Sequence, residues 1–203
     1  MVLLGIDPGL ASTGWGVVRR EGARYASLGH GCLRTAAGDE LGLRLLTIHD
    51  KVRELIREHR PDVLVMEHLY QLRDGSVGLS VGQAVGVVRL AAVQVGLEVV
   101  EYSPTHVKLT LVGNGQADKH QIEYMVQRLL NLPAPPRPDH AADALALCIT
   151  HVHSGLSRAA AGERAAAGQG QASAGAGDRI AQALAADEAR RRQHQRETAE
   201  EPT

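Results

Sequence analysis

The sequence predicts an α/β fold in which helices flank a mixed sheet of five strands. Residues 2–7 and 62–67 are short apolar runs that each end in an acid, which is typical of buried strands. Residues 14–20 and 25–34 follow the first run after short turns, so the first three strands are expected to form an antiparallel meander. Strand and helix patterns alternate after that, which indicates the α/β class.

The helices of this fold are predicted from apolar spacing and capping residues. Apolar residues recur at helical spacing over about 40–59, with Asp39 as the expected N-cap. The dipeptide Ser103-Pro104 is a second helix start, with a cap followed by proline. The remaining expected elements are a small-residue helix at about 76–95, a strand at 97–101, a helix from Ala117 or Asp118 to about 130, a proline-rich linker at 132–138 and a last helix at about 139–153.

The composition changes after Ser154. Ala, Gly, Gln, Arg and Glu dominate residues 154–203, and large apolar side chains nearly vanish. Such a segment buries too little surface to offset its ordering entropy. We therefore expect one folded domain at 1–153 and a mostly disordered tail at 154–203, with a transient helix around 179–196.

Charge and composition restrict the function classes only weakly. The formal net charge is −1, so binding to nucleic acid has to depend on local basic patches and on metal ions held by carboxylates. Cys32 and Cys148 form no CxxC motif and are expected to be buried structural thiols. The first residues show no signal-peptide pattern and no apolar run is long enough to span a bilayer, so a cytoplasmic protein is expected.

Two of the predicted strands end in a single carboxylate, Asp7 and Glu67. A charge at the end of a buried strand has to be solvated, paired or bound to metal. Sites in open α/β sheets gather at the carboxyl ends of strands, so the two acids face each other if their strands are neighbours. The alternative is that each acid only caps a turn.

The start of the last predicted helix adds Asp139, His140 and Asp143. Asp139 is explained by the helix dipole, which favours acids in the first turn. Asp143 lies in an otherwise apolar stretch, where a carboxylate needs a partner such as a metal ion. Three carboxylates and an imidazole that converge would hold one or two divalent ions, as in two-metal phosphoryl transfer.

The ordered set of motifs over about residues 1–153 resembles the RuvC family of Holliday junction resolvases. The matching motifs are Leu-Gly-Ile-Asp-Pro-Gly at 4–9 with Thr13-Gly14, Met66-Glu67, Gly-Gln-Ala at 82–84 with Gly86, Val107-Lys108 before Gly-Asn-Gly at 113–115, and Ala-Ala-Asp-Ala-Leu-Ala at 141–146. The resemblance implies a ribonuclease H-like fold and a metal-dependent endonuclease. It would cut four-way DNA junctions by paired symmetric nicks, leaving 5′-phosphate and 3′-hydroxyl ends in DNA recombination and repair.

The resemblance also implies the catalytic metal ligands, which by position are Asp7, Glu67, His140 and Asp143. Aspartate is common in the family where His140 stands. Two Mg²⁺ or Mn²⁺ ions per subunit are expected. Imidazole nitrogen suits later transition metals better than Mg²⁺, so Mn²⁺ is the expected preference. His140 could instead act as a base for the attacking water, and Asp139 is the competing ligand.

Family positions imply the DNA contacts as well. Tyr70, three residues after Glu67, would be a wedge that stacks on a base, and Lys108 and Lys119 would lie near the scissile phosphate. Arg73 is a weaker candidate for a backbone contact, as is Arg89. For each of these side chains, a solvated or core-edge position is the alternative.

The resemblance finally implies partners: a homodimer whose interface includes the helix at 76–95, and the branch-migration proteins RuvA and RuvB. Three other functions stay open. The Asp-x-Gly and Thr-Gly pattern also resembles the phosphate loop of actin-like ATPases and sugar kinases, although these need two such domains. A junction-binding protein without catalysis and a related nuclease acting on RNA or RNA–DNA hybrids are the others.

Overall fold

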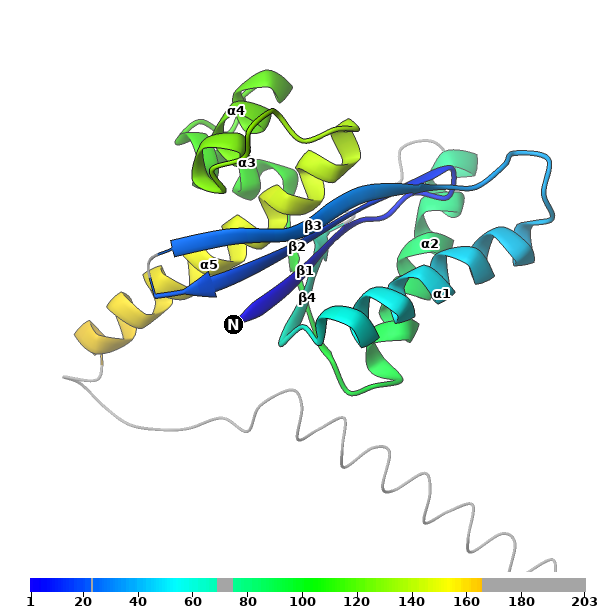
Figure 1. Ribbon diagram of the computed structural model, residues 1–203, viewed down its shortest axis with the longest axis horizontal. Helices are drawn as coiled ribbons and strands as arrows, with labels where there is room; N and C mark the ends of the chain where they lie inside the picture. Colours follow the sequence, from blue (N-terminus) through cyan, green and yellow to red (C-terminus); the bar gives the residue numbers. More distant parts are fainter. Residues whose placement is uncertain (23, 69–74, 166–203) are drawn as a thin grey trace, which may run out of the picture. The chain divides into compact units, whose positions relative to one another are not determined.

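The fold is a five-stranded mixed sheet with helices on both faces (Figure 1). The computed structural model describes residues 1–22, 24–68 and 75–165. All of them belong to one compact unit, Met1–Ala167. Five strands and five helices are described, in the order β1 Val2–Asp7, β2 Ser12–Glu21, β3 Arg24–Arg34, α1 Leu41–His59, β4 Val63–Glu67, α2 Gly75–Val93, β5 Glu98–Tyr102, α3 Pro104–Val112, α4 Lys119–Leu129 and α5 Asp139–Ala165.

The sheet has the strand order β3-β2-β1-β4-β5. Strands β1, β2 and β3 are antiparallel neighbours, as the short turns between them predict. Strand β4 lies parallel to β1 on its other side, and β5 lies parallel to β4. The predicted mixed sheet is confirmed, and β1, which ends in Asp7, is its central strand.

Alternate side chains along the central strands pack into two hydrophobic cores, one on each face of the sheet. Leu3 and Val65 point to the core beneath α3, α4 and α5. Leu4 and Leu64 point to the opposite core beneath α1 and α2. Both strands are therefore apolar throughout, because each face is covered by helices. Burial on both sides also explains why a charged residue occurs only at the strand ends.

Two helix boundaries differ from the sequence-based expectation. Helix α1 is capped by Glu40 and not by Asp39, since the Glu40 carboxylate accepts a hydrogen bond from the Gly42 amide. Helix α5 continues to Ala165 instead of ending near residue 153. Its added part is rich in alanine, the best helix former. That part of the expected disordered tail is therefore helical, while residues 166–203 lie outside the described residues.

Candidate metal centre

Two acids come together at the carboxyl ends of neighbouring strands. Asp7 ends β1 and Glu67 ends β4, and the two strands run parallel with Ile6 beside Met66. The turn that follows Asp7 is fixed by the buried Thr13, whose hydroxyl donates to the Gly9 carbonyl at 2.7 Å. The predicted juxtaposition of the two strand-end acids is therefore confirmed.

Helix α5 brings two more functional groups to this edge because glycines let it lie directly on the sheet. A Cβ atom at Gly14 would lie 2.0 Å from the His140 carbonyl oxygen, and one at Gly5 would lie 2.0 Å from that of Ala144. Both contacts are far shorter than any real Cβ contact. Only glycine therefore permits the close approach that carries the first turns of α5 to Asp7.

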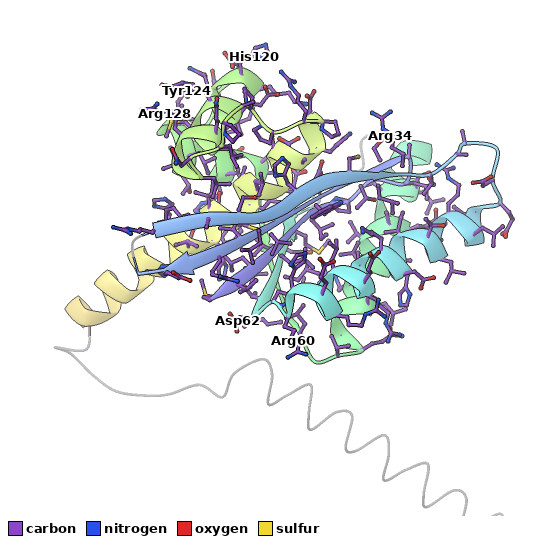
Figure 2. All side chains as sticks on the ribbon, viewed as in Figure 1. Arg34, Arg60, Asp62, His120, Tyr124 and Arg128 are labelled. Carbon is purple, nitrogen blue, oxygen red and sulfur yellow. The ribbon has the colours of Figure 1, made fainter. Side chains whose placement is uncertain are left out.

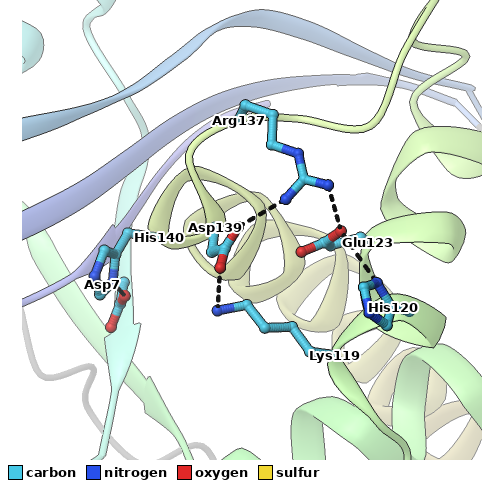
Figure 3. A network of polar contacts seen from close by, with 7 residues as sticks. All are labelled: Asp7, Lys119, His120, Glu123, Arg137, Asp139 and His140. Carbon is cyan, nitrogen blue, oxygen red and sulfur yellow. Dashed lines mark hydrogen bonds and ion pairs between the residues drawn. The ribbon is translucent and has the colours of Figure 1, made fainter.

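Asp7, His140 and Asp143 form a cluster of ligand atoms in which all lie within 4.8 Å of one another. The His140 Nδ1 atom lies 2.7 Å from Asp7 Oδ2 (Figure 3). The Asp7 side chain is 16% exposed and that of His140 46%. Two carboxylates and one imidazole, partly open to solvent, fit a divalent cation.

Glu67 completes the site from the adjacent strand. An open cleft of about 170 Å³ is lined by Asp7, Glu67, Asp143 and Lys108, with apolar walls from α3, α4 and α5. The apolar lining residues are Pro104, Val107, Ile122, Ala146 and Leu147. The cleft thus offers three carboxylates and one ammonium group in a largely apolar surrounding.

The carboxylates of the cleft repel one another. Burial, together with the charges of Asp7 and Asp143, raises the pKa of Glu67 to about 7. Burial and the charge of Asp7 raise the pKa of Asp143 to about 6, although Lys119 and His140 act in the opposite direction. A divalent cation between these groups would relieve both the repulsion and the desolvation. The electrostatics therefore fit a metal centre.

Asp139 points away from this cluster into a separate network of ion pairs (Figure 3). Its carboxylate lies 2.9 Å from Lys119 Nζ and 2.9 Å from Arg137 Nη1. The hydrogen bond from Lys119 is the main cause of its lowered pKa. Among the described residues, Asp139 does not join the cluster of ligand atoms.

Arg137 links this network to a buried acid on α4. Its second guanidinium nitrogen lies 3.5 Å from the Glu123 carboxylate, which is 5% exposed. Sequence analysis did not single out either residue. A signal for Glu123 was present, because helical spacing places it in the buried row with Ile122 and Val126, where a carboxylate needs a partner.

The comparisons with known proteins identify the family. The sequence profile of the family described as "Crossover junction endodeoxyribonuclease RuvC" matches residues 3–151. The chain belongs to the RuvC family. Its relatives include the crossover junction endodeoxyribonucleases RuvC of Rubrobacter xylanophilus, 46% identical over 79% of this chain and 90% of the relative, and of Sodalis glossinidius, 47% identical over 75% and 87%. The chain is accordingly a nuclease that acts on DNA.

Solved RuvC structures agree with this assignment. The Thermus thermophilus RuvC structure matches with a TM-score of 0.72 at 35% identity, covering 78% of this chain and 97% of that one. T. thermophilus RuvC in complex with a Holliday junction substrate matches with a TM-score of 0.74 at 34% identity, covering 78% and 96%. The expected ribonuclease H-like fold is confirmed.

The RuvC family implies a nuclease that depends on divalent metal, and the acidic cluster at Asp7 is the candidate site for it in this chain. Within the described part of the chain, the helices are too short or too polar to cross a bilayer.

The residues that the RuvC resemblance predicts to contact DNA have different surroundings in the structure. Lys108 lines the cleft beside the acids. Lys119 forms an ion pair with Asp139, and Arg89 forms one with Glu101. Tyr70 and Arg73 lie outside the described residues.

Proposed function

We propose that this RuvC-family chain resolves four-way (Holliday) junctions by paired symmetric nicks, in DNA recombination and repair. The observation that carries the proposal is the convergence of Asp7, His140 and Asp143 on one point beside Glu67. The T. thermophilus RuvC complex, which by its name holds a Holliday junction substrate, supports the choice of DNA. We expect products with 5′-phosphate and 3′-hydroxyl ends, as in the family.

The proposed metal ligands are Asp7, Glu67, His140 and Asp143. Two divalent ions bound at such a site activate water and stabilise charge on the attacking and leaving oxygens. The three carboxylates supply the negative charge that holds the cations, and the apolar wall of the cleft strengthens that attraction by excluding water. Asp7 orients the imidazole of His140 through its 2.7 Å contact. His140 then either ligates the metal or accepts a proton from the attacking water.

The imidazole in this ligand set favours Mn²⁺ over Mg²⁺. Single-turnover cleavage measured across a titration of each metal tests this preference. The matched variant is His140→Asp, which restores an all-carboxylate site and should shift the preference toward Mg²⁺. Equal or faster cleavage in Mg²⁺ by the unmodified protein would contradict the proposal.

We assign the scissile phosphate to the neighbourhood of Lys108, which lies in the cleft with the acids. Lys119 is a second cation for this phosphate and would have to exchange its partner Asp139 for it. Tyr70 is proposed as a stacking wedge and Arg73 as a backbone contact. Both follow from their position in the sequence after Glu67.

A homodimer through α2 is supported by exposed apolar side chains. Leu79 and Leu90 are 63% and 53% exposed, and their spacing of three helical turns places them on one face of α2. Helix α1, which packs beside α2, exposes Leu43 and Leu46. An exposed apolar surface of this kind commonly marks a protein interface.

The dimer can be tested by light scattering. Leu90→Glu should yield a monomer, whereas Leu109→Glu, at an equally exposed leucine on α3, should leave the dimer intact. RuvA and RuvB are proposed as partners on family membership, and a cytoplasmic location is proposed with them.

Cleavage of an end-labelled four-way junction, compared with linear duplex and with an RNA–DNA hybrid, tests the function itself. Reactions with Mg²⁺, Mn²⁺ and EDTA are run for the unmodified protein, for Asp7→Asn and for the control Asp139→Asn. Symmetric nicks that need metal and vanish only in Asp7→Asn would support the proposal. Binding without cleavage in every metal would contradict it, as would preferred cleavage of the hybrid.

A further inference from the structure

Helix α4 presents a row of exposed polar side chains that the metal centre does not use. His120, Tyr124 and Arg128 follow one another at intervals of four residues, so they share one face of the helix. Tyr124 is 57% exposed and the His120 side chain 90%. Figure 2 shows all three at the outer side of α4. We call this row the α4 stripe.

The acidic and the basic side chains of α4 lie on different faces of the helix. Glu123 is the one acidic residue in the sequence of this helix, and its buried carboxylate lies against Arg137 and 3.9 Å from His120 Nδ1 (Figure 3). The acid at the N-cap, Asp118, uses its carboxylate on the Gln121 backbone amide at 2.9 Å. The outer face of α4 therefore carries cationic, aromatic and amide groups without a carboxylate among them, in a chain whose net charge is −1.

The stripe is separated from the metal centre by one network of ion pairs. His120 follows Lys119, which forms an ion pair with Asp139, and Asp139 precedes the candidate ligand His140. Figure 3 shows Lys119 and His120 at the start of α4, with Asp7 and His140 beyond Asp139. A strand whose scissile phosphate lies at Asp7 would therefore leave the cleft close to the first turn of α4.

The length and chemistry of the stripe fit a DNA backbone. From His120 to Arg128 the helix rises roughly 12 Å, which corresponds to about three phosphate spacings of one strand along a duplex. Arginine, tyrosine hydroxyl and amide groups are common donors to phosphate oxygens, and such contacts set the register of a protein on the duplex without reading its sequence.

We propose that the α4 stripe binds the phosphate backbone of a duplex arm of the junction, on the side of the scissile phosphate. The inference rests on the proposed function, because it needs DNA in the cleft. The stripe touches no candidate ligand, so it contributes to binding of the substrate and to its register, not to the chemical step. Its occupant is the DNA of the substrate and not a protein partner.

Single-turnover cleavage of a four-way junction with protein in excess tests this assignment, because one titration gives both the rate at saturation and the half-saturating concentration. Arg128→Gln and Tyr124→Phe remove one donor each, and His120→Asn/Tyr124→Phe/Arg128→Gln removes the whole stripe. The matched control is Arg60→Asn, which also removes one exposed cation, at the far end of the molecule (Figure 2). Asn tolerates the left-handed backbone of position 60.

We expect the triple variant to need about tenfold more protein for half-saturation, while its rate at saturation stays within twofold of the unmodified protein. Arg128→Gln alone should lower the slope of log affinity against log salt by about 0.9, the value for one lost phosphate contact. Arg60→Asn should leave both quantities unchanged.

The outcomes distinguish a stripe that does not bind DNA from a failure of the proposed function. If the unmodified protein cuts the junction and the triple variant keeps both its half-saturating concentration and its salt slope, the stripe does not bind DNA and the inference is overturned while the function stands. A loss confined to the rate at saturation would also overturn it. If the unmodified protein cuts no junction, the proposed function fails and the inference fails with it.

Discussion

The substitution Gly14→Ala should disable the metal centre without removing any ligand. The new Cβ atom would lie 2.0 Å from the His140 carbonyl oxygen and 2.4 Å from its carbon, whereas real Cβ contacts essentially never fall below 3.0 Å. The first turn of α5 must therefore recede from the sheet by at least about 1 Å. It carries His140 and Asp143 away from Asp7, which stays on β1 opposite Gly14.

A displacement of that size is large for a cluster whose ligand atoms lie within 4.8 Å of one another. Misplacing reacting groups by about 1 Å can cost about 100-fold in rate. We therefore expect single-turnover junction cleavage by Gly14→Ala to slow by about 100-fold, with a matching loss of Mn²⁺ affinity in a calorimetric titration.

The control is Gly16→Ala, two residues further along the same strand. Its Cβ atom would meet Cδ2 and Cγ of Leu145 at 2.7 and 2.8 Å and the Leu145 backbone nitrogen at 3.1 Å. The nearest backbone atom is therefore about 1 Å further away than at Gly14, and the Leu145 side chain takes up most of the displacement. We expect a similar drop in melting temperature but cleavage within a few-fold of the unmodified protein. The reasoning would be refuted if folded Gly14→Ala bound Mn²⁺ and cut junctions as the unmodified protein does.

Three further predictions concern charge. In EDTA, the pKa of Glu67 is raised to about 7 from an ordinary 4.5. The protonated side chain therefore stabilises the fold below pH 4.5, and this contribution is lost as the pH rises through 7. Glu67→Gln should flatten the decline of melting temperature over this window, and an unchanged pH profile would contradict the assigned burial and repulsion. Arg137→Gln leaves the buried Glu123 carboxylate without its guanidinium partner and should cost about 1–3 kcal/mol of stability in urea denaturation. Adding Glu123→Gln should restore most of this stability. If the losses of the two single variants simply add in the double variant, the two side chains do not act as a pair. Asp139→Asn should keep Mn²⁺ affinity within about twofold, because the Asp139 side chain faces Lys119. Asp143→Asn should lower Mn²⁺ affinity more than about tenfold. Equal losses of affinity in calorimetry would make Asp139 a ligand.

The parts of the site that the sequence predicts are those fixed by backbone topology. Asp7 and Glu67 each end an apolar run, and neighbouring parallel strands bring such ends together whatever the side chains do in detail. Asp143 stands out because a carboxylate in an apolar helical row needs a partner. These features follow from local pattern and from elementary solvation.

The parts that could not be predicted depend on which side chains meet across elements. Lys119 is expected near the scissile phosphate from family position, but the direction of its side chain toward Asp139 depends on how α4 sits against α5. The same holds for Arg137 and Glu123, which come from a linker and a helix interior. The end of α5 at Ala165 was also missed, because a composition poor in large apolar residues does not prevent alanine from extending a helix that has already begun.

The hydrogen bond between Asp7 and His140 joins residues 133 positions apart, which has a consequence for how the protein is made. Asp7 is synthesised well before His140 and Asp143, which come from a helix near the end of the described residues. A growing polypeptide therefore has no assembled cluster until almost all of the fold has left the ribosome. Chains that are released early or cut within the linker before α5 would lack His140 and Asp143, and therefore the assembled cluster.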